Sequence, residues 1–290
     1  MSCSPLQLSY DSHDGFHLSV KVAFNKDSLN LFTQNKTYKS YIIEGIEQNW
    51  SGIYQMDSEL KQACSNFFSW QKTNNRLFKQ DSGKLSECKH AKNIVFQLSE
   101  QHLTELPLDV KLEEDPLSGL QNPRIVFLKR LFQGEPRPIP IFVKKTTILP
   151  SHVASGLFRR FWGIFRTGQI ESMGYNWSRN FPGFAVINDF RNSHRLRQVS
   201  AHEAGHLFGI GDAYDAWYRF FYAAPGTKEY MMHYNTQVHP QEIAMLIRAY
   251  VKNKAQFFPR KFNLRRFSKG FYQEIKFYFK KIFRLFRKRS

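Results

Sequence analysis

Long hydrophobic runs are absent from this 290-residue sequence, and no stretch approaches the roughly 18–20 apolar residues that a membrane-spanning helix needs. The N-terminal segment also lacks the basic start and the apolar run of a secretory signal peptide. We therefore expect a protein that is cytoplasmic as synthesised. Export by a non-classical route and a peripheral position on a membrane are the two alternatives.

Cysteine is scarce, and the three residues, Cys3, Cys64 and Cys88, follow no regular spacing. They cannot all pair with one another, so a disulfide framework is not expected and a reducing compartment is the simpler interpretation. A thiolate that caps a metal site would have to come from Cys64 or Cys88, and neither lies in a recognisable propeptide motif. The sequence also lacks a GxGxxG pattern, a P-loop and a CxxC pair.

Acidic residues are nearly missing from the C-terminal part of the chain. Residues 252–290 contain 14 Lys and Arg but a single acid, which gives this part a net charge of +13 out of +18 for the whole chain. The remaining residues are close to neutral. We therefore divide the sequence into a globular domain, residues 1–253, and a basic aromatic tail, residues 254–290.

The most informative pattern is His202-Glu203-x-x-His206-x-x-Gly209-x-x-Asp212. Two imidazoles four residues apart project from the same face of a helix, where one zinc ion can bind both. Glu203 lies beside them, where its carboxylate can reach a water on the metal without binding the metal. Gly209 can end the helix in the left-handed conformation, and Asp212 can then return as a third ligand. Three protein ligands leave a fourth position to water, as in catalytic zinc sites.

This pattern resembles the metzincin clan of zinc endopeptidases, whose signature is H-E-x-x-H-x-x-G-x-x-H followed by a Met-turn. The resemblance covers about residues 185–250 and matches His202, Glu203, His206, Gly209 and, as the Met-turn methionine, Met232. It implies one catalytic Zn²⁺, Glu203 as general base, and Tyr234 as a zinc ligand or a stabiliser of the tetrahedral intermediate. The sequence departs from the clan at Asp212, where most members have a third histidine. The minority with aspartate there, the snapalysin-like type, are still peptidases, and Asp215 is the fallback ligand.

The resemblance also implies an α+β fold, with a mixed twisted sheet, an active-site helix and a C-terminal helix. Apolar patterning predicts a helix over Tyr38–Tyr54 and another over Pro240–Tyr250. It predicts strands at Phe16–Asn25, Asn93–Ser99, Leu108–Leu112, Arg124–Leu131 and Ile141–Leu149. Residues 57–92 are polar and are predicted to form a loop insertion. Ser155–Thr167 is spaced as a short amphipathic helix.

A short apolar run, Phe184, Ala185, Val186 and Ile187, precedes the zinc helix. In the resembled family a strand in this position lies along the cleft, and the substrate pairs with it as an added antiparallel strand. The residues alone predict a buried strand equally well.

Aromatic residues recur every three or four positions in the tail, with Lys and Arg between them. Residues 268–290 therefore predict a basic amphipathic helix suited to an anionic membrane surface. Nucleic acid is a weaker alternative partner, and packing against the globular domain or disorder is the third.

The leading hypothesis is a zinc endopeptidase that acts on protein or peptide substrates. One rival is a catalytically silent metzincin-like binding module, against which the retention of Glu203 and Tyr234 argues. A second rival is a membrane-binding or nucleic-acid-binding protein with an accidental HExxH. A hydrolase site, a membrane-seeking tail and no export signal would suit an effector or toxin delivered by specialised machinery. The sequence carries no signal for an oligomeric state.

Overall fold

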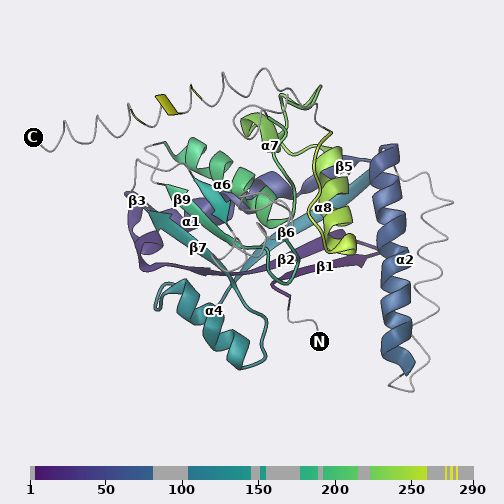
Figure 1. The fold of residues 1–290 in the computed structure, drawn as a ribbon, viewed down its shortest axis with the longest axis horizontal. Coiled ribbons are helices and arrows are strands. Elements are labelled where there is room, and N and C mark those ends of the chain that lie inside the picture. The colour runs from purple at the N-terminus through teal and green to yellow at the C-terminus, as the bar shows by residue number, and fades with distance from the viewer. Residues whose placement is uncertain are drawn as a thin grey trace, which may run out of the picture.

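The computed structural model describes residues 4–80, 104–144, 151–154, 177–188, 192–214 and 223–259, together with residues 272, 275, 276 and 279. The strands of this described part are β1 (Leu6–Asp11), β2 (Gly15–Phe24), β3 (Leu31–Thr33), β4 (Lys36–Thr37), β5 (Gly52–Gln55), β6 (Glu105–Glu114), β7 (Ile139–Lys144), β8 (His152–Ala154) and β9 (Phe184–Asn188). Its helices are a short 3-10 turn, η1 (Lys26–Leu29), and α1 (Tyr38–Trp50), α2 (Ser58–Gln80), α4 (Pro123–Phe132), α6 (Ser193–Leu207), α7 (Met231–Tyr234) and α8 (Pro240–Lys252). Figure 1 shows their arrangement.

Seven of the described strands form one mixed sheet in the order β5-β6-β2-β7-β9-β8, with β1 also paired to β2. β6, β2, β7 and β9 are parallel to one another, whereas β1, β5 and β8 are antiparallel to their neighbours. Parallel neighbours need a crossover connection, and helices supply it between β2 and β6 and between β6 and β7. The predicted mixed sheet is confirmed, and these crossovers make the fold α/β rather than the expected α+β.

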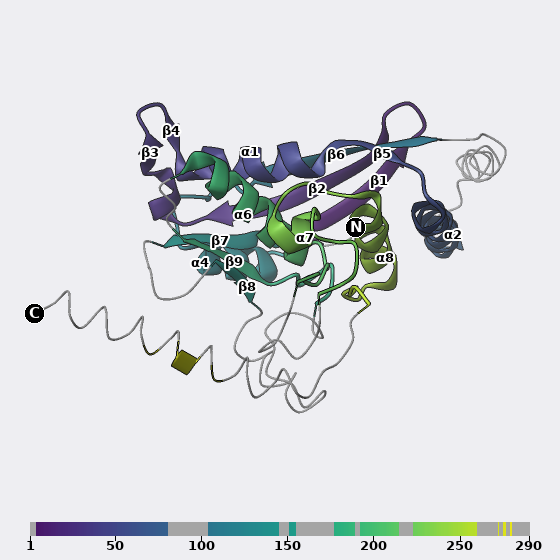
Figure 2. The ribbon, with the colours of Figure 1, turned by 90° about the horizontal axis from the view of Figure 1, so that it is seen from above.

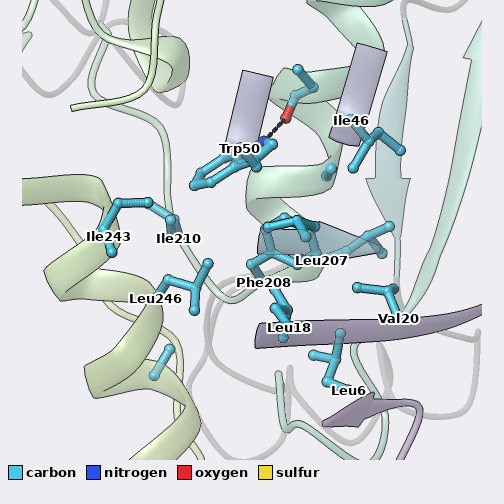
Figure 3. Packing of buried hydrophobic residues seen from close by; sticks show 14 of the residues in the cluster. Leu6, Leu18, Val20, Ile46, Trp50, Leu207, Phe208, Ile210, Ile243 and Leu246 are labelled. Atoms are coloured by element: carbon cyan, nitrogen blue, oxygen red, sulfur yellow. Dashed lines mark hydrogen bonds between the residues drawn. The ribbon is translucent and has the colours of Figure 1, made fainter. Parts of the chain in front are cut away.

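One face of the sheet carries the main hydrophobic core. Alternate residues of β2 belong to this core: Phe16, Leu18, Val20, Val22 and Phe24. α1, α6 and α8 supply much of the rest, as Figure 3 shows for Trp50, Leu207 and Leu246. Trp50 is fully buried and donates a hydrogen bond from Nε1 to the Ala201 carbonyl of α6 at 2.8 Å. The core therefore fixes α6, which carries the histidine motif, against α1.

α4 lies on the other side of the sheet from α6 (Figure 1). The prediction of a strand at Arg124–Leu131 is wrong, because this segment forms α4. The Asn122 side chain caps the helix by accepting from the Arg124 N–H at 3.0 Å, and Pro123 stands in the first turn. The β-branched and aromatic residues that favoured a strand instead give the helix an apolar side, on which Val126 is buried.

α2 lies beside α8 at one end of the molecule (Figure 1). The prediction of a loop insertion over residues 57–92 is therefore wrong for Ser58–Gln80, and residues 81–92 lie outside the described part. The buried residues of α2 follow helical spacing: Leu60, Ala63, Cys64, Phe67 and Phe68.

Burial raises the pKa of the Cys64 thiol to about 12, so Cys64 does not supply a metal-capping thiolate in this structure. Cys88 lies outside the described residues.

The predicted boundary between globular domain and tail, after residue 253, is too early. Ala255 and Phe258 are buried. Gln256 donates its N–H to the Gly209 carbonyl at 2.8 Å and accepts from the Gly211 N–H at 2.9 Å, so it pins the segment that follows α6. The folded domain therefore extends at least to residue 258. Among the described helices, none is both long and apolar enough to cross a membrane.

Most other predicted elements are found. The strands at Phe16–Asn25 and Leu108–Leu112 correspond to β2 and β6, and the helix at Pro240–Tyr250 corresponds to α8. The predicted helix at Tyr38–Tyr54 is present as α1 up to Trp50, whereas its last residues belong to β5. The strand at Ile141–Leu149 is present up to Lys144 as β7. The predictions for residues 93–99, 145–149 and 155–167, and most of those for 268–290, lie outside the described residues.

Candidate metal centre

α6 carries both motif histidines near its C-terminal end. The helix begins after Asn192, whose side chain accepts a hydrogen bond from the His194 N–H at 2.9 Å. It ends at Leu207, and Gly209 has a φ of +89°, in the left-handed region that side chains with a Cβ resist. The chain therefore turns back after Gly209 and returns Asp212 to the helix.

The structure brings the three predicted ligands, His202, His206 and Asp212, together. Asp212 Oδ1 lies 3.2 Å from Nε2 of His202 and 3.2 Å from Nε2 of His206. One ligand atom of each residue lies within 4.8 Å of the other two. Ligands bound to a tetrahedral zinc at 2.0–2.2 Å are about 3.3–3.6 Å apart, so this group could hold one such ion. Asp215, the fallback ligand, lies outside the described residues.

Backbone carbonyls hold the second ring nitrogen of both histidines. Nδ1 of His202 lies 2.8 Å from the Met231 carbonyl oxygen, and Nδ1 of His206 lies 2.8 Å from the Ile210 carbonyl oxygen. A carbonyl only accepts, so each Nδ1 carries a proton and donates. This leaves each Nε2 facing Asp212, which is the orientation that metal ligation requires.

Glu203 lies beside the three ligands but is not one of them. Its side chain is buried, with the residue 6% exposed, and its Oε2 atom has no hydrogen-bond partner among the described residues. A buried carboxylate oxygen without a partner is costly. A metal-ligated water beside it would remove that cost, so the residues present fit a catalytic metal.

The buried charged groups of the site shift one another's pKa values. Burial raises the pKa of the Glu203 carboxyl, while His206 and His202 act against that rise. Burial alone would lower the pKa of His206, but the Asp212 carboxylate raises it to about 9. Burial would raise the pKa of Asp212, yet His206 and His202 hold it well below its usual range. The buried Asp212 carboxylate thus favours a proton on the neighbouring imidazole of His206.

The turn formed by α7 packs against the histidine helix (Figure 2). Met231 and Met232 are fully buried. A Cβ added to Gly205, which lies between the two histidines, would collide with Met232 Sδ and lie 2.9 Å from Cζ2 of Trp50. The glycine therefore permits the close approach of Met232 beneath the motif.

Tyr234, the predicted catalytic tyrosine, follows on α7 and is exposed. Its ring centroid lies 4.4 Å from that of His233, a buried histidine whose Nδ1 is 3.0 Å from Thr227 Oγ1. Tyr214, which the sequence reasoning missed, stacks on the candidate ligand His202 with ring centroids 6.0 Å apart. Aromatic rings therefore extend from the ligand toward the surface, with Tyr234 at the outer end.

Phe184, Ala185, Val186 and Ile187 lie in a buried strand, as the residues alone predicted, and the pairing of this strand does not support a role in binding substrate. These residues form β9, which pairs with β7 on one side and with β8 on the other. Both edges of β9 are occupied over residues 185 and 186, so no substrate strand can add there. The edge strand on this side of the described sheet is β8.

Glu242 is a second residue that the sequence reasoning missed. It is fully buried in the first turn of α8, and its carboxylate accepts from the Met232 and His239 N–H groups, both at 2.8 Å. The one local signal is the capping-box spacing from His239 to Glu242. That spacing predicts the bond to His239 but not the bond to Met232.

Comparisons with protein-family models, with curated proteins and with solved structures found no match to this chain.

Proposed function

We propose that this protein is a zinc-dependent endopeptidase of metzincin type, with zinc held by His202, His206 and Asp212. The main support is the presence of the three ligand atoms beside a buried Glu203 oxygen that lacks a partner. Two imidazoles and one carboxylate, with a fourth position left to water, are a ligand set of catalytic zinc.

A zinc ion held by His202, His206 and Asp212 would lower the pKa of a water from about 15.7 to about 7 and so supply a nucleophile at neutral pH. Glu203 would act as the general base, taking a proton from the attacking water and passing it to the leaving amine. Tyr234, from the rim, donates a hydrogen bond to the oxyanion that develops on the substrate. His202 and His206 keep their Nδ1 protons on backbone carbonyls throughout, which fixes both rings.

The first test compares the zinc-loaded protein with its Glu203→Ala variant on a pool of unstructured peptides, read by mass spectrometry. We expect the variant to keep one zinc per chain and to lose activity by about 10²–10⁴-fold, the usual contribution of general base catalysis. Loss of zinc from the variant would show that Glu203 is a ligand instead. Zinc binding without cleavage by either protein would favour the silent binding module.

A further inference from the structure

The buried carboxylate of Glu242 reaches beyond its own helix. Its Oε2 atom accepts from the His239 N–H at 2.8 Å, which is an ordinary cap of α8. Its Oε1 atom accepts from the Met232 N–H at 2.8 Å, and Met232 belongs to α7, beneath the metal site. A capping residue needs only the first of these bonds.

The Met232 N–H and the Met231 carbonyl belong to the same peptide unit. That carbonyl accepts from Nδ1 of His202 at 2.8 Å. One peptide plane thus joins the Glu242 carboxylate to the His202 ring. Burial raises the pKa of Glu242 to about 7, but both of its oxygens accept backbone N–H groups, which favours the ionised form. Hydrogen bonds in such a chain polarise one another, so a carboxylate at one end makes the carbonyl at the other end a stronger acceptor.

His206 offers a comparison within the same site. Its Nδ1 donates to the Ile210 carbonyl at 2.8 Å, and the N–H of that same peptide, on Gly211, donates to the Gln256 carbonyl at 2.9 Å. Both ligands are therefore held through one peptide unit. The chain from His206 ends on a neutral carbonyl, whereas the chain from His202 ends on a carboxylate.

We propose that Glu242 is a positioning residue for the metal ligand His202, acting through the Met231–Met232 peptide. The carboxylate orients this peptide and makes His202 Nε2 a better donor to the metal. Metal-ligating histidines usually donate to a carboxylate or a carbonyl. His202 donates to a carbonyl, and the N–H of the same peptide donates to the Glu242 carboxylate. The proposal rests on the proposed zinc site.

The test is the zinc affinity of Glu242→Gln, measured by competition with a chromophoric chelator well below the unfolding temperature. Glutamine keeps the shape of the side chain but removes its charge. Its amide has only one oxygen, so one of the two N–H groups, that of Met232 or that of His239, faces an NH₂ group and loses its acceptor. We expect zinc affinity to fall by about 10–100-fold, as for other outer partners of ligating histidines. The absorption spectrum of the cobalt-substituted variant should also differ from that of the parent.

Ile243→Val is the matched control, because Ile243 is buried on the same helix and its side chain has no polar group. It should lower the unfolding temperature without changing zinc affinity. If Glu242→Gln lowers the unfolding temperature but leaves the zinc affinity and the cobalt spectrum unchanged, Glu242 only caps the helix and the proposal is wrong. A parent protein that binds no zinc would overturn the proposed function as well, so the two failures are distinguishable.

A measurement on the unmodified protein covers the case in which Glu242→Gln does not fold. In the zinc-loaded protein the Nδ1 proton of His202 should resonate further downfield than that of His206, because its hydrogen-bond chain ends on an anion. Equal positions for the two protons, or the reverse order, would contradict the proposal.

Discussion

At the scale of single residues, each histidine of the site has its Nδ1 atom hydrogen-bonded and its Nε2 atom facing Asp212. His202 and His206 each donate from Nδ1 to a backbone carbonyl, so neither ring can rotate without losing a bond. Asp212 enters from the loop after Gly209 and completes the set. The spacing within one helix and one turn is local, which is why the sequence pattern predicted all three members of the group that could hold a metal ion.

Asp212→Ala removes one of three protein ligands. We expect zinc affinity to fall by more than the roughly 10–100-fold that loss of an outer partner costs. Metal content after dialysis against a weak chelator measures the effect, with Asp215→Ala as the control that should stay loaded. Full zinc content in Asp212→Ala, together with loss in Asp215→Ala, would transfer the third ligand to Asp215.

Glu242 shows where sequence reasoning at this scale ends. Its capping-box spacing is visible in the sequence, but the bond to Met232 joins two elements whose mutual placement depends on the whole core. The same holds for Tyr214, which stacks on His202 only because the chain turns back at Gly209. Neither contact can be predicted from the spacing of residues along the sequence.

At the scale of elements, the site depends on how closely α7 approaches α6. Gly205→Ala should test this contact, because alanine is the better helix former by about 1 kcal/mol where nothing obstructs its Cβ. Here the Cβ meets Met232 Sδ and the Trp50 ring, and overpacking costs about 1–3 kcal/mol. We expect a net loss in the free energy of unfolding, measured with urea. Gly52→Ala, where the nearest atom to an added Cβ is 3.8 Å away, should be near neutral. A Gly205→Ala protein as stable as its parent would contradict the packing described.

The two mispredicted elements, α2 and α4, have different causes. In α2 the buried residues do follow helical spacing, but the polar residues between them outnumber them and favoured a loop. In α4 the β-branched and aromatic composition favoured a strand, although Asn122 and Pro123 are start signals for a helix. The N-terminal cap at Asn122 favours a helix for α4, whereas α2 is stabilised by packing against α8.

At the scale of the whole molecule, the globular domain and the basic tail are expected to act separately. Tyr272, Ile275 and Phe279 are helical, exposed and spaced by three and four residues, which supports an apolar stripe for an anionic membrane surface. Gln256 and Phe258 belong to the folded domain, so a clean truncation must begin after residue 259.

Deletion of residues 260–290 should leave cleavage of soluble peptides unchanged and abolish sedimentation with phosphatidylserine-containing vesicles. Basic residues near such a surface contribute about 1 kcal/mol each, and the binding should weaken at high salt. Vesicles of phosphatidylcholine alone are the control and should bind neither protein. Loss of peptide cleavage on deletion would show that the tail is part of the catalytic unit.

The place of Gln256 in the chain also bears on the order of folding. Gln256 binds the loop between His206 and Asp212, although it lies more than forty residues further along the chain. Trp50 binds α6, although it lies about 150 residues before its partner in that helix. Contacts of such long sequence separation close late and slow the search for the native state. We therefore expect the loop that carries Asp212 to reach its final place only after these distant contacts have formed.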